Sequence, residues 1–211
     1  MTKKQRGALC VEALEKEYPD AICSLVYEDP LQLLIAVRLS AQCTDERVNK
    51  VTPALFEKYP DLESFCNAEV EDIEKLIYSC GFYKTKAKDI KEMAIMIRDT
   101  FDGRVPDSIE KLTSLPGVGR KTANLIMGDV YKQPAIVADT HLIRITNLIG
   151  LVETKDPKKV ELELKKIIAG EKSNDFCHRM VLHGRAVCIA RRPQCHKCCI
   201  KDYCKTGSKK Q

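Results

Sequence analysis

The sequence contains no tryptophan, and aromatic residues make up only 6% of its 211 positions. A surface that stacks a row of single-stranded bases uses several aromatic side chains, so the composition disfavours that class of binding protein. No apolar run approaches the roughly 20 residues that a membrane helix needs, and the N-terminus lacks the hydrophobic region of a secretory signal. We therefore expect a soluble, cytoplasmic protein with no membrane partner.

The composition is otherwise typical of one compact globular chain or of two small lobes, with 44% hydrophobic and 31% charged residues. The 11 cysteines are an odd number, and in an intracellular chain they are expected to be reduced, metal-bound or catalytic. The net charge of +5 favours a polyanionic partner. Two segments are rich in basic residues, namely 191–211, with Asp202 as the one acid, and the cluster Lys84, Lys86, Lys88 and Lys91.

The hydrophobic pattern predicts an all-α protein, because apolar residues recur at three- and four-residue spacing and period-two alternation is scarce. The expected helix starts are Asp29 before Pro30, Asp107 with Glu110, and Asp156 before Pro157. Gly150 and Gly170 are expected to end helices. The predicted helices cover residues 3–17, 31–41, 46–58, 70–79, 84–101, 108–114, 120–131, 140–149, 158–169 and 175–187.

A glycine-rich turn separates two of these helices, where residues 115–123 read LPGVGRKTA. Gly117 and Gly119 allow close approach of the backbone to a neighbour, and amides at the start of the next helix can bind a phosphate oxygen. The segment is therefore interpreted as a sequence-independent phosphate clamp. The alternative is an ordinary helix corner in which the glycines serve geometry alone.

Lys121 lies in the first turn of the helix that follows. The helix dipole and partial burial would lower the pKa of its amine there, and the neutral amine is a nucleophile. Asp139 follows eighteen residues later, directly before another helix. By itself Asp139 is interpreted as an N-cap, a role worth about 1 kcal/mol. Together the two residues could form an amine and acid pair for covalent catalysis.

Four cysteines near the C-terminus have the spacing C-x6-C-x2-C-x5-C, formed by Cys188, Cys195, Cys198 and Cys204. Four thiolates suit either tetrahedral zinc or an iron-sulfur cluster, and ligand softness does not separate the two. Cys199 does not fit the pattern and is interpreted as a bystander or a competing ligand. The other cysteines, which are scattered, are expected to be small core or surface residues.

The hairpin string resembles the helix-hairpin-helix of the DNA glycosylase superfamily, and Lys121 within it resembles the bifunctional branch. Residues 137–144 (VADTHLIR) are similar to the catalytic aspartate segment, and the cysteine spacing resembles the 4Fe-4S loop of the endonuclease III family. The resemblance implies a two-lobed all-α fold and one 4Fe-4S cluster. It also implies a six-helix barrel over residues 23–133, with its helix-hairpin-helix at about 108–131, and a cluster domain of residues 1–22 and 134–211 with the cluster loop at 188–204.

The same resemblance implies a monomeric base excision repair enzyme that acts on damaged duplex DNA at the nucleoid. As a DNA N-glycosylase and abasic-site lyase, it would remove oxidised pyrimidines such as thymine glycol. Lys121 would form a Schiff base with the sugar, Asp139 would assist, and β-elimination would nick the strand 3′ to the abasic site. The DNA contacts that the resemblance implies are Gln42, Asp45, Phe82, Gly117, Val118, Gly119, Arg120 and Thr122.

Residues 33–42 (LLIAVRLSAQ) resemble the family segment whose glutamine enters the duplex, and within it Leu34, Val37 and Leu39 are expected to be buried. Residues 81–83 match the family's wedge loop, where Phe82 often has a leucine counterpart and Cys80 an aliphatic one. Three other hypotheses remain open. They are a monofunctional mismatch glycosylase, which Lys121 argues against, a non-catalytic DNA clamp, and a zinc-stapled helical adaptor.

Overall fold

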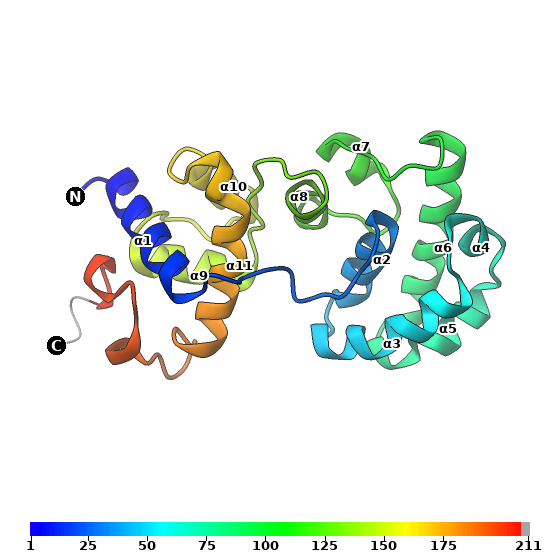
Figure 1. Ribbon diagram of the computed structural model, residues 1–211, viewed down its shortest axis with the longest axis horizontal. Helices are drawn as coiled ribbons and strands as arrows, with labels where there is room; N and C mark the ends of the chain where they lie inside the picture. The colour runs from blue at the N-terminus through cyan, green and yellow to red at the C-terminus, as the bar shows by residue number, and fades with distance from the viewer. Residues whose placement is uncertain (208–211) are drawn as a thin grey trace. The chain divides into compact units, whose positions relative to one another are not determined.

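The computed structural model describes residues 1–207, and within this range the chain is helical and contains no strand (Figure 1). The all-α prediction is therefore confirmed. The α-helices are α1 (Lys3–Glu17), α2 (Pro30–Ser40), α3 (Asp45–Lys58), α4 (Leu62–Asn67), α5 (Val70–Ile77), α6 (Tyr83–Thr100), α7 (Ile109–Ser114), α8 (Arg120–Asp129), α9 (Thr140–Ile149), α10 (Pro157–Leu164) and α11 (Gly170–Ala186). Short 3-10 helices are η1 (Tyr78–Cys80), η2 (Cys195–Lys197) and η3 (Lys201–Tyr203).

The chain divides into two compact units, and each buries its own apolar side chains. One unit is continuous, Ser24–Tyr131, and contains α2 to α8. The other combines Met1–Cys23 with the chain from Lys132 onward, so that α1 packs in the same unit as α9, α10 and α11. Residues 208–211 of the expected cluster domain lie outside the described residues.

The continuous unit is built around α2 and α6. Helix α2 has few polar residues and packs against α3, α6 and α8, while α6 packs against α4 and α5. Leu34 and Leu39 are fully buried as expected, whereas Val37 is only half-buried, so the burial predicted for Val37 is wrong. Complete burial of such side chains contributes about 1.5 to 3 kcal/mol each, which makes α2 a rigid support for the turn that follows it.

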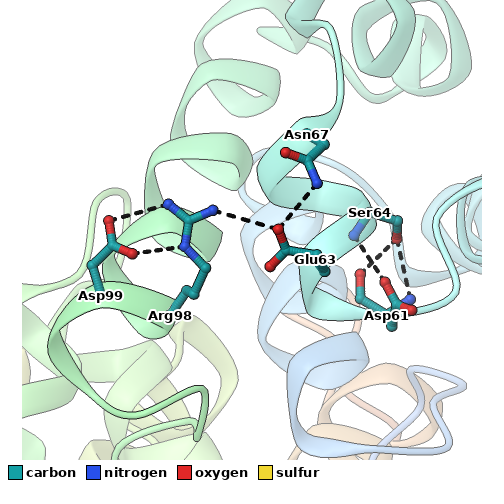
Figure 2. A network of polar contacts seen from close by, with 6 residues as sticks. All are labelled: Asp61, Glu63, Ser64, Asn67, Arg98 and Asp99. Atoms are coloured by element: carbon teal, nitrogen blue, oxygen red, sulfur yellow. Dashed lines mark hydrogen bonds and ion pairs between the residues drawn. The ribbon is translucent and has the colours of Figure 1, made fainter.

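Helix α4 is absent from the sequence-based prediction, although its start carries a recognisable signal. The Ser64 amide donates to Asp61 Oδ1 at 2.8 Å and the Asp61 amide donates to Ser64 Oγ at 3.2 Å, which is a capping box (Figure 2). Arg98 of α6 pairs with Asp99 at 2.6 Å and reaches Glu63 of α4 at 3.7 Å. The Arg98–Glu63 pair joins the two helices, and because an exposed pair contributes at most about 1 kcal/mol, it orients α4 on α6 more than it stabilises it.

The discontinuous unit packs α11 against both α1 and α9. Its core includes Leu14, Phe176 and Met180, all fully buried. Gly170 was expected to end a helix, and this prediction is wrong, because Gly170 begins α11. A Cβ at Gly170 would come within 3.2 Å of the Pro134 ring, so close packing rather than helix termination accounts for the glycine.

The other cap predictions have mixed outcomes. Asp29 and Asp156 cap α2 and α10 ahead of a first-turn proline, and Gly150 ends α9 with a φ of +84°. Asp107 is not the cap of α7, because the Ser108 hydroxyl, one residue later, accepts the hydrogen bond from the Lys111 amide. In the described residues, no helix has both the length and the hydrophobicity required to cross a membrane.

Candidate functional site

The glycine-rich turn joins α7 to α8 as a tight hairpin. The Val118 amide donates to the Leu115 carbonyl at 3.1 Å, and both side chains are buried, at 7% and 2% exposure. Gly117 has a φ of +71°, a left-handed conformation that residues with a Cβ adopt at a cost. The side chains of the turn therefore anchor it, which leaves backbone atoms to face outward at Gly117 and Gly119.

An ion pair beneath the turn explains why Gly117 has no side chain. Arg38 of α2 contacts Asp89 of α6 through Nε at 2.7 Å and through its terminal nitrogen at 2.6 Å, and both side chains are mostly buried. A Cβ at Gly117 would lie 2.4 Å from Arg38 Nε and 2.7 Å from Asp89 Oδ2. The hairpin backbone thus packs directly on the Arg38–Asp89 pair, which positions the turn relative to α2 and α6.

Helix α8 begins with an N-terminus suited to an anion. Gly119 is its N-cap in an extended conformation, and within residues 1–207 no side chain makes a capping hydrogen bond there. A Cβ at Gly119 would meet nothing within 4 Å, so the space beside this residue at the helix start is open. Backbone amides and the helix dipole favour a phosphate at such a position.

Lys121 occupies the first turn of α8 and is exposed. The partial burial expected from the sequence is therefore wrong, because Lys121 points away from the face that carries the buried Ala123 and Ile126. Arg120 and Thr122, on either side of it, are half-buried. The Lys121 side chain is therefore exposed to solvent, next to the hairpin that is suited to a phosphate.

Asp139 belongs to the other unit, where it caps α9. Its Oδ1 accepts from the Leu142 amide at 2.7 Å, and its own amide donates to the Val137 carbonyl at 2.8 Å. The preceding residues Ala135 and Ile136 are fully buried, which anchors this segment. The N-cap interpretation is confirmed, and the carboxylate remains half-buried at the start of the helix. Lys121 and Asp139 are each held at a helix N-terminus of a different unit.

Two turns of the continuous unit carry the other predicted contact residues. Gln42, after α2, and Phe82, after η1, are exposed non-glycine residues with φ values of +52° and +48°. Phe82 is 67% exposed, which is unusual for a large apolar side chain. Asp45 begins α3 and accepts from the Ser24 hydroxyl at 2.6 Å. Left-handed backbone at exposed side chains of this kind is typical of functional sites.

The predicted basic cluster on α6 is not a single surface feature. Lys84 and Lys88 are exposed and Lys91 is half-buried, and Lys88 pairs with Glu92 at 3.7 Å. Lys86, in contrast, is 1% exposed and belongs to the core. The prediction that Lys86 lies in this basic cluster is therefore wrong, because positions 86, 90, 93 and 97 form the buried face of α6.

The four spaced cysteines Cys188, Cys195, Cys198 and Cys204 line one cavity of about 220 Å³ in the discontinuous unit. Cys199 is not among the lining residues, as expected of a bystander. In the described residues, no three His, Cys, Asp or Glu side chains already converge closely enough to hold a metal ion. Four thiols around one small, mostly apolar cavity nevertheless provide the donor set that an iron-sulfur cluster requires.

Polar groups surround these sulfur atoms. Arg144 donates to the Cys188 carbonyl at 2.6 Å and lies 3.6 Å from its Sγ, and the Gly207 amide donates to Cys204 Sγ at 3.2 Å. His183 is fully buried with Nε2 3.4 Å from Cys198 Sγ. Burial raises the pKa of the Cys198 thiol to about 12, so without a cationic partner this sulfur stays protonated. Donors aimed at sulfur are typical of cluster sites.

Three comparisons with known proteins identify the same family. A family model described as HhH-GPD superfamily base excision DNA repair protein matches residues 35–169. The chain is 46% identical over 204 residues to endonuclease III of Synechocystis sp., covering 96% of this chain and 93% of that protein. It is 38% identical over 202 residues to endonuclease III of Bacillus subtilis, covering 95% and 92%. A solved structure of a trapped endonuclease III-DNA covalent intermediate matches with a TM-score of 0.92 and 42% identity, covering 99% of this chain and 98% of that one.

Proposed function

Because the chain belongs to the endonuclease III family of HhH-GPD superfamily base excision DNA repair proteins, we propose that it removes oxidised pyrimidines, such as thymine glycol, from duplex DNA and then nicks the strand. The chain is a base excision repair DNA glycosylase with lyase activity at abasic sites, and it has the two-lobed helix-hairpin-helix glycosylase fold. We assign the barrel lobe to Ser24–Tyr131 and the cluster lobe to the other unit.

The observation that carries the mechanism is the placement of Lys121, an exposed amine in the first turn of α8 beside the anion-suited hairpin. A strand held by its phosphate at Gly117 and Gly119 would present the adjoining sugar to this amine. Lys121 Nζ then attacks the anomeric carbon, the N-glycosidic bond breaks, and the base leaves with the bonding electrons. A solved endonuclease III structure contains a trapped covalent intermediate with DNA, which supports this assignment of a covalent route.

Asp139 is proposed as the acid–base partner of Lys121. Its carboxylate would accept a proton from the Lys121 ammonium, so that the neutral amine can attack, or stabilise positive charge that develops on the sugar. The bond to the Leu142 amide fixes one oxygen, so the other can face the reacting sugar without rotation of the carboxylate. Because Asp139 and Lys121 belong to different units, the proposed chemistry needs both units at one nucleotide.

Strand cleavage follows from the same adduct. Opening of the sugar ring gives a Schiff base between Lys121 and the anomeric carbon. Loss of a proton from C2′ neutralises the iminium and gives an enamine. The nitrogen lone pair of the enamine then expels the phosphate from C3′, which breaks the strand and leaves an unsaturated iminium-linked sugar on the 5′ fragment. Water then hydrolyses the imine and regenerates the lysine.

The exposed turns are proposed to open the duplex. Gln42 and Phe82 would occupy the space vacated in the base stack, and Asp45 would contact the lesion that has flipped out. Arg120 and Thr122, together with the hairpin amides, would hold the phosphates without reading sequence. The energetic cost of flipping is lowest where pairing is already damaged, which contributes to lesion selectivity.

The cavity in the discontinuous unit is proposed to hold one 4Fe-4S cluster through Cys188, Cys195, Cys198 and Cys204. When bound, such a cluster supplies a rigid covalent staple for the loop that follows α11. Exposed basic residues of that loop, among them Arg191 and Arg192, would then face DNA phosphates in a fixed arrangement. A monomer bound to the chromosome in the cytoplasm is the state in which we expect the enzyme to act.

The test is a base-release and nicking assay on duplexes that carry thymine glycol, an oxidised purine or a simple mismatch. We expect release and nicking together on thymine glycol, and loss of both in Lys121→Ala. Alkali treatment separates the two steps, because it cleaves any abasic site that the enzyme leaves intact. Base release that needs alkali for cleavage would instead indicate a monofunctional glycosylase, and binding without release would indicate a clamp.

A further inference from the structure

Two exposed turns with left-handed backbone lie at the ends of neighbouring helical segments in the continuous unit. Gln42 follows the C-terminus of α2, and Phe82 follows that of η1, which contacts α3 and α6. Both are residues with a Cβ in a conformation that glycine adopts more readily. Such a conformation persists only where the surrounding structure holds it in place, so each turn needs a support.

The side chain of Lys86 provides that support to both turns at once. Its Nζ donates to the Leu39 carbonyl at 2.8 Å and to the Cys80 carbonyl at 2.7 Å. Leu39 precedes Gln42 by three residues, and Cys80 precedes Phe82 by two. These carbonyls belong to the last turns of their helices, which lack partners within the helix and carry partial negative charge. One ammonium therefore fixes the ends of both segments.

The burial of this cation is what distinguishes Lys86 from an ordinary core residue. Lysine is almost never fully buried unless it is paired, yet Lys86 is 1% exposed and its ammonium donates to the neutral carbonyls of Leu39 and Cys80. Burial lowers the pKa of the Lys86 ammonium, while the neighbouring thiols of Cys43 and Cys80 act in the opposite direction. An apolar residue of similar length would fill the same space without the desolvation penalty, so packing alone does not account for a lysine here.

We propose that Lys86 is a positioning residue that couples the Gln42 and Phe82 turns, so that both side chains enter the duplex as one unit. The inference rests on the proposed function, since it assigns the task of these turns to DNA opening. A fixed spacing between the two side chains would reduce the conformational freedom that each loses on binding. Lys86 itself touches no DNA, and it acts only through the residues that precede the two turns.

The test is a set of binding measurements with the full chain on a duplex that carries a tetrahydrofuran abasic analogue. Lys86→Met keeps the length of the side chain and removes the donors, and Lys75→Met, at an exposed position on α5, is the matched control for one lost charge. We expect Lys86→Met to weaken binding by roughly tenfold relative to Lys75→Met. A difference smaller than about threefold would overturn the proposal.

The deciding comparison repeats Lys86→Met in a protein that already carries Gln42→Ala and Phe82→Ala. Because Lys86 acts through these residues, the further loss should be smaller than about threefold. A larger loss in this background would mean that Lys86 supports the fold in general, and it would overturn the proposal. Urea unfolding of each variant separates affinity from the folded fraction.

If Lys86→Met does not fold, the proposal is tested in the protein with Lys86 intact, by the energetic coupling between Gln42 and Phe82 in DNA binding. The loss of affinity in the double variant with Gln42→Ala and Phe82→Ala should then differ by more than about threefold from the product of the losses in the two single variants. Agreement with that product to within about threefold would overturn the proposal. The proposed function fails separately, because it requires base release from thymine glycol by the unsubstituted enzyme.

Discussion

The carboxylate of Asp139 has two roles that substitution can separate. It caps α9 through the Leu142 amide, and it is proposed to act on the sugar. Asparagine caps a helix about as well as aspartate, so Asp139→Asn should change the free energy of unfolding by less than about 0.5 kcal/mol. Asn has no carboxylate, so single-turnover base release should fall by roughly a hundredfold or more. Urea unfolding and quenched single-turnover assays measure the two effects.

Asp139→Ala completes the comparison. It removes the cap as well as the acid, and it should lower the free energy of unfolding by about 1 kcal/mol with a loss of base release similar to that of Asp139→Asn. Retention of full activity in Asp139→Asn would show that the residue is a cap alone.

The sequence identified candidate residues best where a recognisable string surrounded them. Lys121, Asp139 and the four cysteines came from such strings, and the structure places the cysteines around one cavity. The exposure of Lys121 and the burial of Lys86 were predicted wrongly, because both depend on which face of a helix meets the core. The spacing of Lys86 with Ile90, Met93 and Ile97 was the signal that could have revealed the buried lysine.

The two glycines of the hairpin between α7 and α8 have different structural roles. Gly117 combines a φ of +71° with contacts that leave no room for a Cβ, so Gly117→Ala should lower the free energy of unfolding by about 2 kcal/mol or more. Gly119 faces open space, and Gly119→Ala should lower it by less than about 1 kcal/mol. Thermal or urea unfolding of the two variants tests this order.

Gly119→Ala also tests whether the hairpin binds a phosphate. A methyl group at Gly119 would project into the space assigned to a phosphate and weaken binding to an abasic-analogue duplex by roughly tenfold, as expected for one lost charged hydrogen bond. If Gly119→Ala bound DNA normally, the hairpin would not be the phosphate clamp.

Helix boundaries were predictable where capping chemistry was explicit. Asp29 before Pro30 and Asp156 before Pro157 located the starts of α2 and α10 to within one residue. Helix α4 was missed because six residues are too few to show a clear period, although Asp61 and Ser64 form a capping box. The start of α11 was missed because Gly170 was taken as a helix end, whereas it packs closely against Pro134, a tertiary contact that no local pattern reports.

In the whole molecule, the proposed functional residues belong to both units. Lys121 belongs to the continuous unit, and Asp139 and the cysteine cavity belong to the discontinuous unit. Cys195→Ser should therefore lower iron and sulfide content, folded yield and DNA affinity together. Cys199→Ser is the matched control, because Cys199 adjoins Cys198 in sequence but does not line the cavity. Metal analysis and visible absorbance of anaerobically purified protein measure loading. Full loading in Cys195→Ser would remove that residue from the ligand set.

The proposed mechanism depends above all on a covalent imine between Lys121 and the sugar of a damaged nucleotide. The most direct measurement is borohydride trapping on a duplex with a single thymine glycol, using the unsubstituted enzyme and Lys121→Ala, with folding of both verified beforehand. The unsubstituted enzyme should yield a stable protein–DNA adduct whose modified peptide contains Lys121, and Lys121→Ala should yield none. An adduct of equal amount in Lys121→Ala, or no adduct from a folded enzyme that binds the duplex, would contradict the mechanism.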